Sequence, residues 1–453
     1  MDKLIEKYNV QVPRYTSYPP ANFFNDKFTE KDYIKELIAS NDNHPQTLSF
    51  YFHIPYCRNL CHYCGCNSFP MVTEFEITKY VETLHKEIDI VLPLINKKRI
   101  ISQIHYGGGT PTVLGSNVLK ELNDHLLHNF NTIDKPEIAI ECHPGWMNEN
   151  DWTSLSDIGF NRFSIGVQDF NTEVLKCVNR KPSLMPVGEI VSLLKTEGNS
   201  VNLDLLYGLP YQTELTFMKT VESAVKANPD RLVTFSYAHV PWVNERQKIL
   251  EQYGLPGSVE KKKMFESASK ILTDSGYLKI GMDHFVKPHD ELAEALRTKS
   301  LHRNFQGYCT RQTTGQVYAF GVTGITQLTS SYFQNEKNID VYILKVNSGV
   351  LPVSKGYILN RSQQITRIVI EMLMCNYQID WNEISLITGI TPNEIKELIW
   401  IDSNKLLEME YDGLISIAED SIKVNDEGKL YVRNVASAFD PLNDNTQKYS
   451  KPL

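Results

Sequence analysis

The 453-residue sequence lacks long apolar runs and lacks an excess of positive charge. No uninterrupted apolar segment approaches the length that spans a bilayer, and the first residues contain no apolar segment of the signal-peptide type. The formal net charge of −8 argues against a nucleic-acid partner. Repeats and low-complexity tracts are also missing from the sequence. We therefore expect a cytoplasmic protein without a membrane span, folded as one large domain and a smaller one.

Cysteine, in contrast, is concentrated in one short segment. Cys57, Cys61, Cys64 and Cys66 directly follow the apolar run at 48–54. The first three have the spacing C-x3-C-x2-C, which lets three thiolates from one loop converge on a single metal centre. Three thiolates on a cube of four irons leave one iron without a protein ligand, and a catalytic metal site needs such an open position.

Two other uses of these cysteines are possible. The four thiolates could bind zinc, although zinc ligands usually form a C-x2-C pair with a second pair farther along the chain. A disulfide framework is typical of small secreted chains instead. The remaining cysteines are isolated, and we expect each to be a small buried residue: Cys142, Cys177, Cys309 and Cys375.

Strand-like and helix-like segments alternate between residues 48 and 240. Strands are predicted at 48–54, 102–106, 137–141, 162–167, 201–207 and 232–240. Helices are predicted at 74–92, 117–128, 171–178, 186–197 and 215–227. This alternation indicates an α/β fold with parallel strands and right-handed crossovers. In barrels of this kind the functional groups lie at the carboxyl ends of the strands.

Polar or glycine-rich segments do follow the predicted strands. They are the cysteines, Gly107–Thr112, Glu141, Gln168 with Arg180 a helix later, Asp204, and the segment around Ala238. Glycines at a strand end let the backbone approach a ligand and present its amide groups, although a simple tight turn would use them as well. Taken singly, each carboxylate or amide could be a buried and satisfied group, and Arg180 could form a surface salt bridge.

Several motifs carry a resemblance to a known family. Cys57-x3-Cys61-x2-Cys64, with an aromatic residue before the last cysteine, resembles the signature of the radical S-adenosylmethionine (SAM) superfamily. Cys66 extends that run, and Pro13–Pro19, the GMDHF segment at 281–285 and the HRNFQGY segment at 302–308 are similar to oxygen-independent coproporphyrinogen III oxidases (dehydrogenases). The resemblance covers nearly the whole chain.

The resemblance implies a partial (β/α)6 barrel and an oxidoreductase. Cys57, Cys61 and Cys64 would hold a [4Fe-4S] cluster, and the family also suggests a second SAM molecule. The residues implied at the cluster and SAM are Tyr51, Tyr63, Gly108, Gly109, Thr110, Glu141, Gln168, Arg180, Asp204, Ala238 and Ile325, with Tyr51 also counted as catalytic. Acidic residues suit the ribose hydroxyl and amino groups of SAM, and an arginine suits its carboxylate.

The implied reaction occurs in haem (porphyrin) biosynthesis. The reduced cluster cleaves SAM, and the resulting 5′-deoxyadenosyl radical removes hydrogen from a propionate of coproporphyrinogen III. Loss of CO2 and one electron leaves a vinyl group, and repetition on a second propionate gives protoporphyrinogen IX. A reducing partner such as flavodoxin or ferredoxin and a monomeric state are also implied.

The two family-specific segments carry groups that suit this substrate. Positive charge for carboxylates comes from His284, Lys287, Arg303 and Arg311. Flat apolar faces for a macrocycle come from Phe285, Phe305 and Tyr308. Without the resemblance, these aromatic residues would be assigned to the core.

We predict three parts: an N-terminal arm and helix at 1–46, a radical SAM barrel with a substrate-binding extension at 47–345, and a mainly helical domain at 346–453. The Pro-rich arm is either disordered or docked on the barrel, and a docked arm would help to close it. The last part combines helices at 361–375, 382–389, 392–398 and 404–410 with a hairpin at 414–424, and so resembles a winged helix. A structural cap is the favoured role, because no basic helix face appears.

Two other functions remain open at this point. A related radical SAM branch contains haem chaperones, which usually lack the fourth cysteine and the segments around His284 and Gln306. The other is a zinc-stabilised regulator that uses the winged-helix module.

Overall fold

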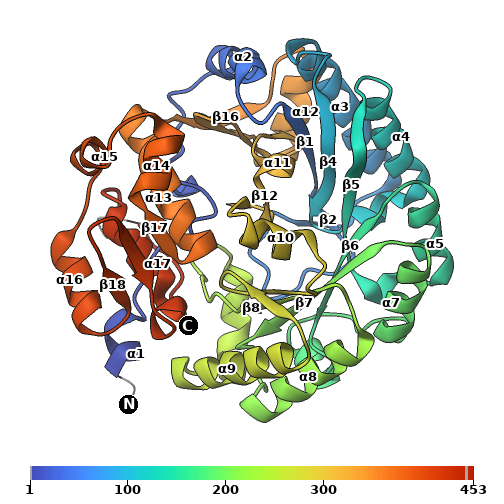
Figure 1. The fold of residues 1–453 in the computed structure, drawn as a ribbon. Coiled ribbons are helices and arrows are strands. Elements are labelled where there is room, and N and C mark those ends of the chain that lie inside the picture. The colour runs from blue at the N-terminus through green and yellow to red at the C-terminus, as the bar shows by residue number, and fades with distance from the viewer. Residues whose placement is uncertain (1–2, 444–446) are drawn as a thin grey trace.

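The structure is a computed structural model, and it describes residues 3–443 and 447–453. Its centre is a curved sheet with helices on the convex face (Figure 1). Six neighbouring strands of this sheet run parallel, as predicted: β1 (Thr47–Ile54), β4 (Ile100–Gly108), β5 (Thr132–Cys142), β6 (Arg162–Gln168), β7 (Ser200–Tyr207) and β8 (Arg231–Ser236). The α/β fold with a partial barrel is therefore confirmed.

The helices that connect the strands also agree with the prediction. They are α3 (Glu74–Val91), α4 (Gly115–Leu127), α6 (Thr172–Cys177), α7 (Val187–Thr196) and α8 (Glu214–Ala227). After β8 the chain forms α9 (Ser258–Asp274). One further helix, α5 (Glu149–Asp157), is not among the predicted ones. It is short and buries only Trp152 and Leu155, so its helical periodicity is weak, but Asn148 and Asp151 form a capping box at its start.

The sheet is longer than the predicted barrel. Its order is β16-β15-β14-β13-β1-β4-β5-β6-β7-β8-β10-β9, so the described strands form an open sheet. Most of the additional strands come from residues 259–345, where the sequence pattern is irregular, and β16 follows them. They are β9 (Leu278–Ile280), β10 (His284–Val286), β13 (Val317–Phe320), β14 (Ile325–Gln327), β15 (Ser331–Asn335) and β16 (Val353–Ile358). Of these, β13 runs parallel to β1, and α12 (Ile339–Asn347) packs against α3.

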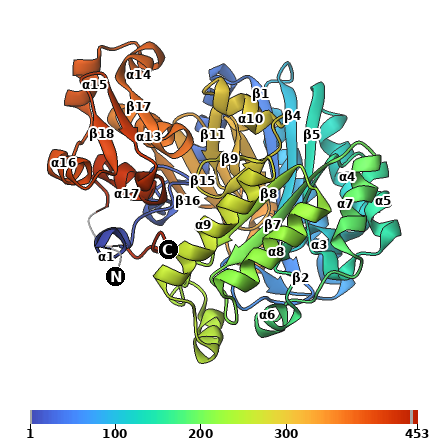
Figure 2. The same ribbon diagram turned by 60° about the horizontal axis from the view of Figure 1, so that its bottom comes forward.

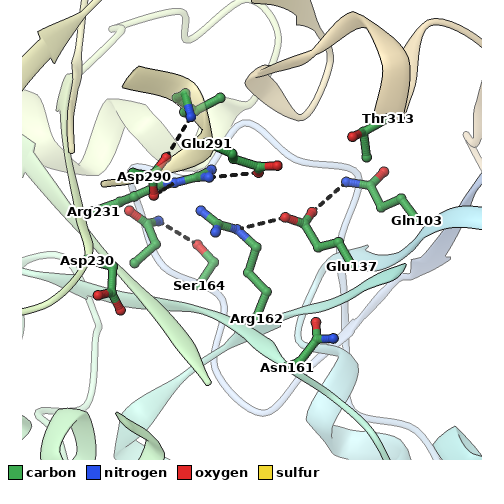
Figure 3. Close-up of polar contacts among 12 residues, drawn as sticks. Gln103, Glu137, Asn161, Arg162, Ser164, Asp230, Arg231, Asp290, Glu291 and Thr313 are labelled. Carbon is green, nitrogen blue, oxygen red and sulfur yellow. Dashed lines mark hydrogen bonds and ion pairs between the residues drawn. The ribbon is translucent and has the colours of Figure 1, made fainter. Parts of the chain in front are cut away.

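The concave side of the sheet is filled by α10 (Glu291–Arg297), α11 (Arg311–Thr314) and the hairpin of β11 (Leu301–Asn304) and β12 (Gly307–Thr310) (Figure 1). Polar contacts hold these segments in place at the amino ends of the strands (Figure 3). Arg231, at the start of β8, lies 2.6 Å from Asp290 and 2.8 Å from Glu291. Beside it, Arg162 lies 3.3 Å from Glu137. Because this end is filled by ion pairs, the open end of the barrel is the one at the carboxyl ends.

The C-terminal part packs beside the sheet, as both ribbon views show (Figures 1 and 2). It contains α13 (Arg361–Asn376), α14 (Trp381–Thr388), α15 (Pro392–Leu398), α16 (Ser403–Tyr411) and α17 (Val432–Ala436). The predicted hairpin is present as β18 (Ile415–Ile417) and β19 (Ser421–Val424), and β17 (Gln378–Asp380) adds a third strand. Because β16 pairs with β15 in the main sheet, we propose a domain boundary after β16 rather than at residue 346.

The N-terminal arm is docked on the C-terminal part. Its helix α1 (Lys3–Tyr8) places the ring of Tyr8 at 5.7 Å from that of Tyr431. Farther along the arm, the hydroxyl of Tyr15 donates to Asp440 at 3.0 Å. The arm then leads into α2 (Glu30–Ala39), for which Thr29 is the N-terminal cap residue. The described part of the arm is therefore docked rather than disordered, and these contacts are with the C-terminal part rather than with the barrel.

Candidate active site at the carboxyl ends of the strands

The four clustered cysteines lie at the carboxyl end of β1. Cys57 ends β2 (Tyr56–Cys57), and the other three lie in the connection to β3 (Phe69–Pro70). We call residues 57–66 the cysteine loop. All of its thiols are free, as are the isolated cysteines, so no disulfide framework exists among them. Within the described residues, no three His, Cys, Asp or Glu side chains are already gathered around one metal position. The thiols must therefore turn toward one another to share a cluster.

Side chains from distant segments hold the backbone of the cysteine loop. Asn179 and Asn244 donate to two of its carbonyl groups at 3.0 and 2.8 Å, and Gln247 donates to a third at 2.9 Å. Asn179 follows α6, and the other two lie after β8. Sequence reasoning missed these three residues, because an amide side chain in an irregular segment carries no motif.

Hydrogen-bond donors also point at the sulfur atoms. Thr110 lies 3.5 Å from the Cys57 sulfur, and a guanidinium N–H of Arg180 lies 3.5 Å from that of Cys61. The sulfur of Cys64 accepts a main-chain N–H at 3.4 Å. Donors of this kind stabilise thiolates and tune a bound cluster. The loop therefore presents three sulfur atoms that each have a donor.

The thiols differ in their acidity. A hydrogen bond from the Cys66 thiol lowers the pKa of Cys64 to about 6, against the effect of burial. Burial raises the pKa of Cys57. Cys66 is thus a donor to the third cysteine of the motif.

The glycine run at the end of β4 packs against Glu141. The N–H of Gly108 donates to one carboxylate oxygen at 3.2 Å, and His105 lies 3.4 Å from the other. A Cβ atom at Gly107 would lie 2.6 Å from that carboxylate. The glycines are thus needed for close packing of the strand ends.

Two further amides of the run donate to the protein's own backbone. The N–H of Gly109 donates to the carbonyl of Ile54 at 2.7 Å, and that of Thr110 donates to Tyr56 at 2.9 Å. A Cβ at Gly109 would meet the same backbone at 2.8 Å. The run therefore fixes the base of the cysteine loop.

Arg180 and Gln168 converge above β6. The buried guanidinium of Arg180 donates to the carbonyl of Gly166 and lies 3.2 Å from the hydroxyl of Tyr63. Burial alone would lower the pKa of Arg180, but Tyr63 and Cys61 raise it above its usual value. Gln168 has a φ of 69°, in the left-handed region, and a Cβ on Gly166 would contact both side chains at 2.8 Å. Arg180 is therefore not in a surface salt bridge.

Asp204 is a buried acid on β7. Ser164 donates to it at 2.9 Å and Asn202 at 2.8 Å. Burial raises the pKa of Asp204 to about 6 in spite of these bonds. Its contacts thus join β6 and β7 beneath Gln168.

Two cavities meet at the cysteine loop. One, of about 380 Å³, is lined by the predicted residues Tyr51, Glu141 and Ile325, together with Cys66, Asn304 and Gln306. The other, of about 510 Å³, is lined by the predicted residues Tyr63, Gln168 and Ala238, together with Arg14, Tyr15 and Trp242. Gly65 and Phe305 line both. Five other predicted residues line neither cavity. Gly108 contacts Glu141, which lines the first cavity, and Thr110 and Arg180 contact the cysteine loop. Among the described residues, Gly109 and Asp204 contact neither a lining residue nor the loop by hydrogen bonds.

Only part of the two family-specific segments reaches these cavities. Phe305 and Gln306 do. Phe285 is fully buried in the core, and Lys287 lies over the Tyr277 ring, next to the start of β8. Arg311 pairs with Glu371 at the amino ends of β1 and β4. The suggestion that Lys287, Arg311 and Phe285 meet the substrate is therefore wrong.

Comparison with known proteins places this geometry in a family. A model of the radical SAM superfamily matches residues 51–224. The oxygen-independent coproporphyrinogen III oxidase of Synechocystis is 36% identical over 449 residues, which are 98% of this chain and 96% of that protein. The Escherichia coli enzyme of the same name is 37% identical over 96% of this chain and 94% of its own.

This chain belongs to the oxygen-independent coproporphyrinogen III oxidase family.

The fold agrees with this membership. The solved structure of the Escherichia coli coproporphyrinogen III oxidase, described as a radical SAM enzyme, superposes with a TM-score of 0.88 and 36% identity. The match covers 97% of this chain and 98% of that one, so it includes the arm and the C-terminal part. The cofactors of this radical SAM family are a [4Fe-4S] cluster and SAM.

The residues of this oxidase fit a cluster. Three reduced thiols with C-x3-C-x2-C spacing lie in one loop, and each sulfur accepts a hydrogen bond. Soft thiolate ligands select iron–sulfur clusters, and donors to the sulfurs are the usual surroundings.

Among the described helices, none is long and apolar enough to cross a bilayer.

Proposed function

We propose that this protein catalyses the oxygen-independent oxidative decarboxylation of two propionate side chains of coproporphyrinogen III, which gives protoporphyrinogen IX for haem biosynthesis. The observation that carries the proposal is the cysteine loop with three reduced thiols at the open end of a barrel whose full length matches this family. The cluster and SAM, when bound, supply the one-electron chemistry that removes hydrogen from the substrate.

The residues of the chain bind, orient and shield. We propose that Cys57, Cys61 and Cys64 hold the cluster, and that Glu141 and Arg180 orient SAM beside it. A carboxylate suits the hydroxyl and amino groups of SAM, and a guanidinium suits its carboxylate. The further SAM-contacting residues in this proposal are Tyr51, Tyr63, Gly108, Gly109, Thr110, Gln168, Asp204, Ala238 and Ile325.

We propose that the macrocycle binds across the two cavities, where Phe305 offers a flat face to each of them. Residues of the arm and of the C-terminal tail line the larger cavity, among them Tyr15 and Tyr449. Such walls exclude water and stray hydrogen donors from a reactive site. A monomeric state, a cytoplasmic location and reduction by flavodoxin or ferredoxin complete the proposal.

An anaerobic assay tests this function. The protein is reconstituted with iron and sulfide, then supplied with dithionite, SAM and coproporphyrinogen III, and 5′-deoxyadenosine is measured together with oxidised porphyrins. We expect protoporphyrin to form alongside deoxyadenosine, and to disappear in Cys57→Ser, Cys61→Ser and Cys64→Ser. Deoxyadenosine without any decarboxylated porphyrin, even with an added electron acceptor, would contradict the proposed substrate. Stable haem binding in that case would favour a haem chaperone.

A further inference from the structure

A small positively charged recess opens beside Ala238, between the barrel, the arm and the C-terminal part. It measures about 50 Å³. The basic side chains that line it are Arg14, Lys279, Lys429, Arg433 and Lys451. Asp283 is the one carboxylate among its lining residues. We call this site the basic recess. It is continuous with the 510 Å³ cavity, because Arg14 and Ala238 line both.

The negative charges nearby do not balance this cluster. Asp283 lies 2.8 Å from the ring nitrogen of His284 and 3.9 Å from the guanidinium of Arg14. Lys429 is paired outside the recess, with Asp426 at 2.7 Å. Within the described residues, no ion pair joins Lys279 or Arg433 to a carboxylate. Positive charge thus remains in excess at a partly buried site, where Arg433 is buried and Lys279 is half-buried.

Arg433 supplies a fixed charge to the recess. Its guanidinium donates to the carbonyl groups of Val12 and Pro13 on the arm, and to those of Ser450 and Lys451 on the tail. Its hydrogen-bonding capacity is therefore used by the protein, and it acts on a ligand through its field. Burial lowers its pKa to about 9.

Lys279 and Arg14 are the groups with donors to spare. The ammonium of Lys279 stands 4.6 Å from the centre of the Phe265 ring, and among the described residues it has no hydrogen-bond acceptor. Burial, with a contribution from Lys429, lowers the pKa of Lys279 to about 8. Buried cations without counter-charges are unfavourable, and a bound anion would remove that cost. The chemistry of the recess therefore calls for an anion.

We infer that the basic recess binds a carboxylate of the porphyrinogen, held by Arg14 and Lys279, from a propionate that is not at the reaction centre. This inference rests on the proposed function. The recess has room for a carboxylate group and not for a pyrrole ring, whereas the cavity that it joins has room for the macrocycle. A guanidinium and an ammonium that line the same recess can each donate to one carboxylate oxygen. The bound propionate would fix the rotation of the ring and so select which propionate reaches the reaction centre.

Binding measurements on the cluster-loaded protein test this without relying on turnover. Quenching of porphyrin fluorescence gives the Kd of coproporphyrin III, the stable oxidised form with the same propionates, and of its uncharged tetramethyl ester. In Lys279→Met we expect the Kd of the acid to rise about tenfold or more, because a charge-assisted hydrogen bond is lost. The Kd of the ester should not change. Lys270→Met removes an exposed lysine of the neighbouring helix α9 and should leave both values unchanged.

Four further measurements complete the test. Arg14→Gln should weaken binding of the acid selectively as Lys279→Met does, Lys279→Arg should restore it, and in turnover KM should rise more than kcat falls. Inorganic phosphate should compete with the acid in the unsubstituted protein and lose that effect in Lys279→Met. An unchanged Kd of the acid, an equal loss for acid and ester, or equal phosphate competition in both proteins would overturn the inference. If one of these results is obtained while the enzyme still makes protoporphyrin, the inference fails and the proposed function stands. If the unsubstituted protein makes no protoporphyrin, the proposed function itself is refuted.

Discussion

At the scale of single residues, Cys66 illustrates the difference between a neighbour and a ligand. It donates to Cys64, and it lines the smaller cavity. We expect Cys66→Ala to retain the iron and sulfide content of the unsubstituted protein after reconstitution, because three thiolates suffice. Cys57→Ala should lose most of both. Metal analysis checks this, with Cys177→Ala, a buried and isolated cysteine, as the control. Loss of iron in Cys66→Ala to the level of Cys57→Ala would make Cys66 a ligand.

Glu87 makes stability depend on pH from within the core. It accepts hydrogen bonds from Tyr342 at 2.6 Å, Asn335 at 2.7 Å and the N–H of Gly321 at 2.8 Å, yet burial raises its pKa from 4.5 to about 7. The folded state then holds a proton that the unfolded state releases. Its contribution to stability is full below pH 4.5 and is lost as pH rises through 7.

We expect Glu87→Gln to remove this dependence, which is on the order of 3 kcal/mol at most. Urea unfolding at pH 5 and pH 8 measures it. The difference in the free energy of unfolding between the two values should be smaller in Glu87→Gln than in the unsubstituted protein. An identical difference in both proteins would show that other groups set the slope.

Individual site residues were predictable where chemistry and strand position coincide. Glu141 and Gln168 are polar groups at strand ends, and both line a cavity. The predicted substrate contacts of Lys287 and Arg311 were wrong, because their segments follow no regular strand–helix pattern. The sequence therefore did not indicate which end of the barrel these residues occupy. The basic recess was not predictable, since Arg14, Lys279 and Arg433 come from three distant segments.

At the scale of elements, the parallel strands were predictable to within a few residues, because buried strands are near-continuous apolar runs. The filling of the barrel was not, because α10, α11 and the β11–β12 hairpin are short and are held by contacts distant in sequence. The amide side chains that hold the cysteine loop could not be predicted either, because their partners are distant in sequence. Tertiary contacts decide such segments, and propensity does not.

Arg231 anchors the segments that fill the barrel. It pairs with Asp290 and Glu291 at the start of α10, and its side chain is 7% exposed (Figure 3). We expect Arg231→Met to lower the free energy of unfolding by about 3–5 kcal/mol, because it leaves a buried carboxylate unpaired. Urea denaturation measures this. Arg297→Met removes an exposed pair with Glu294 in the same helix and should cost less than about 1 kcal/mol. Equal effects of the two substitutions would show that the buried pairs carry no special weight.

At the scale of the whole molecule, the arm and the tail together wall the larger cavity. We expect deletion of residues 1–20 to lower protoporphyrin formation and to raise the amount of 5′-deoxyadenosine made per product, because water and other hydrogen donors gain access. Tyr15→Phe, which loses the bond to Asp440, should change the ratio in the same direction by a smaller amount. The ratio of the two products under anaerobic conditions is the measurement. An unchanged ratio and rate in the deletion variant would refute the shielding role of the arm.

The hydrogen bonds from Arg433 to the arm and the tail have a consequence for the order in which the molecule is completed during synthesis. Domains fold in the order in which they leave the ribosome, from the N-terminus onward. The cysteine loop emerges hundreds of residues before Arg433, so the barrel can form while neither wall of the cavity can yet be fastened. We therefore expect the cysteine loop to stay open on this side until the C-terminal part has been made.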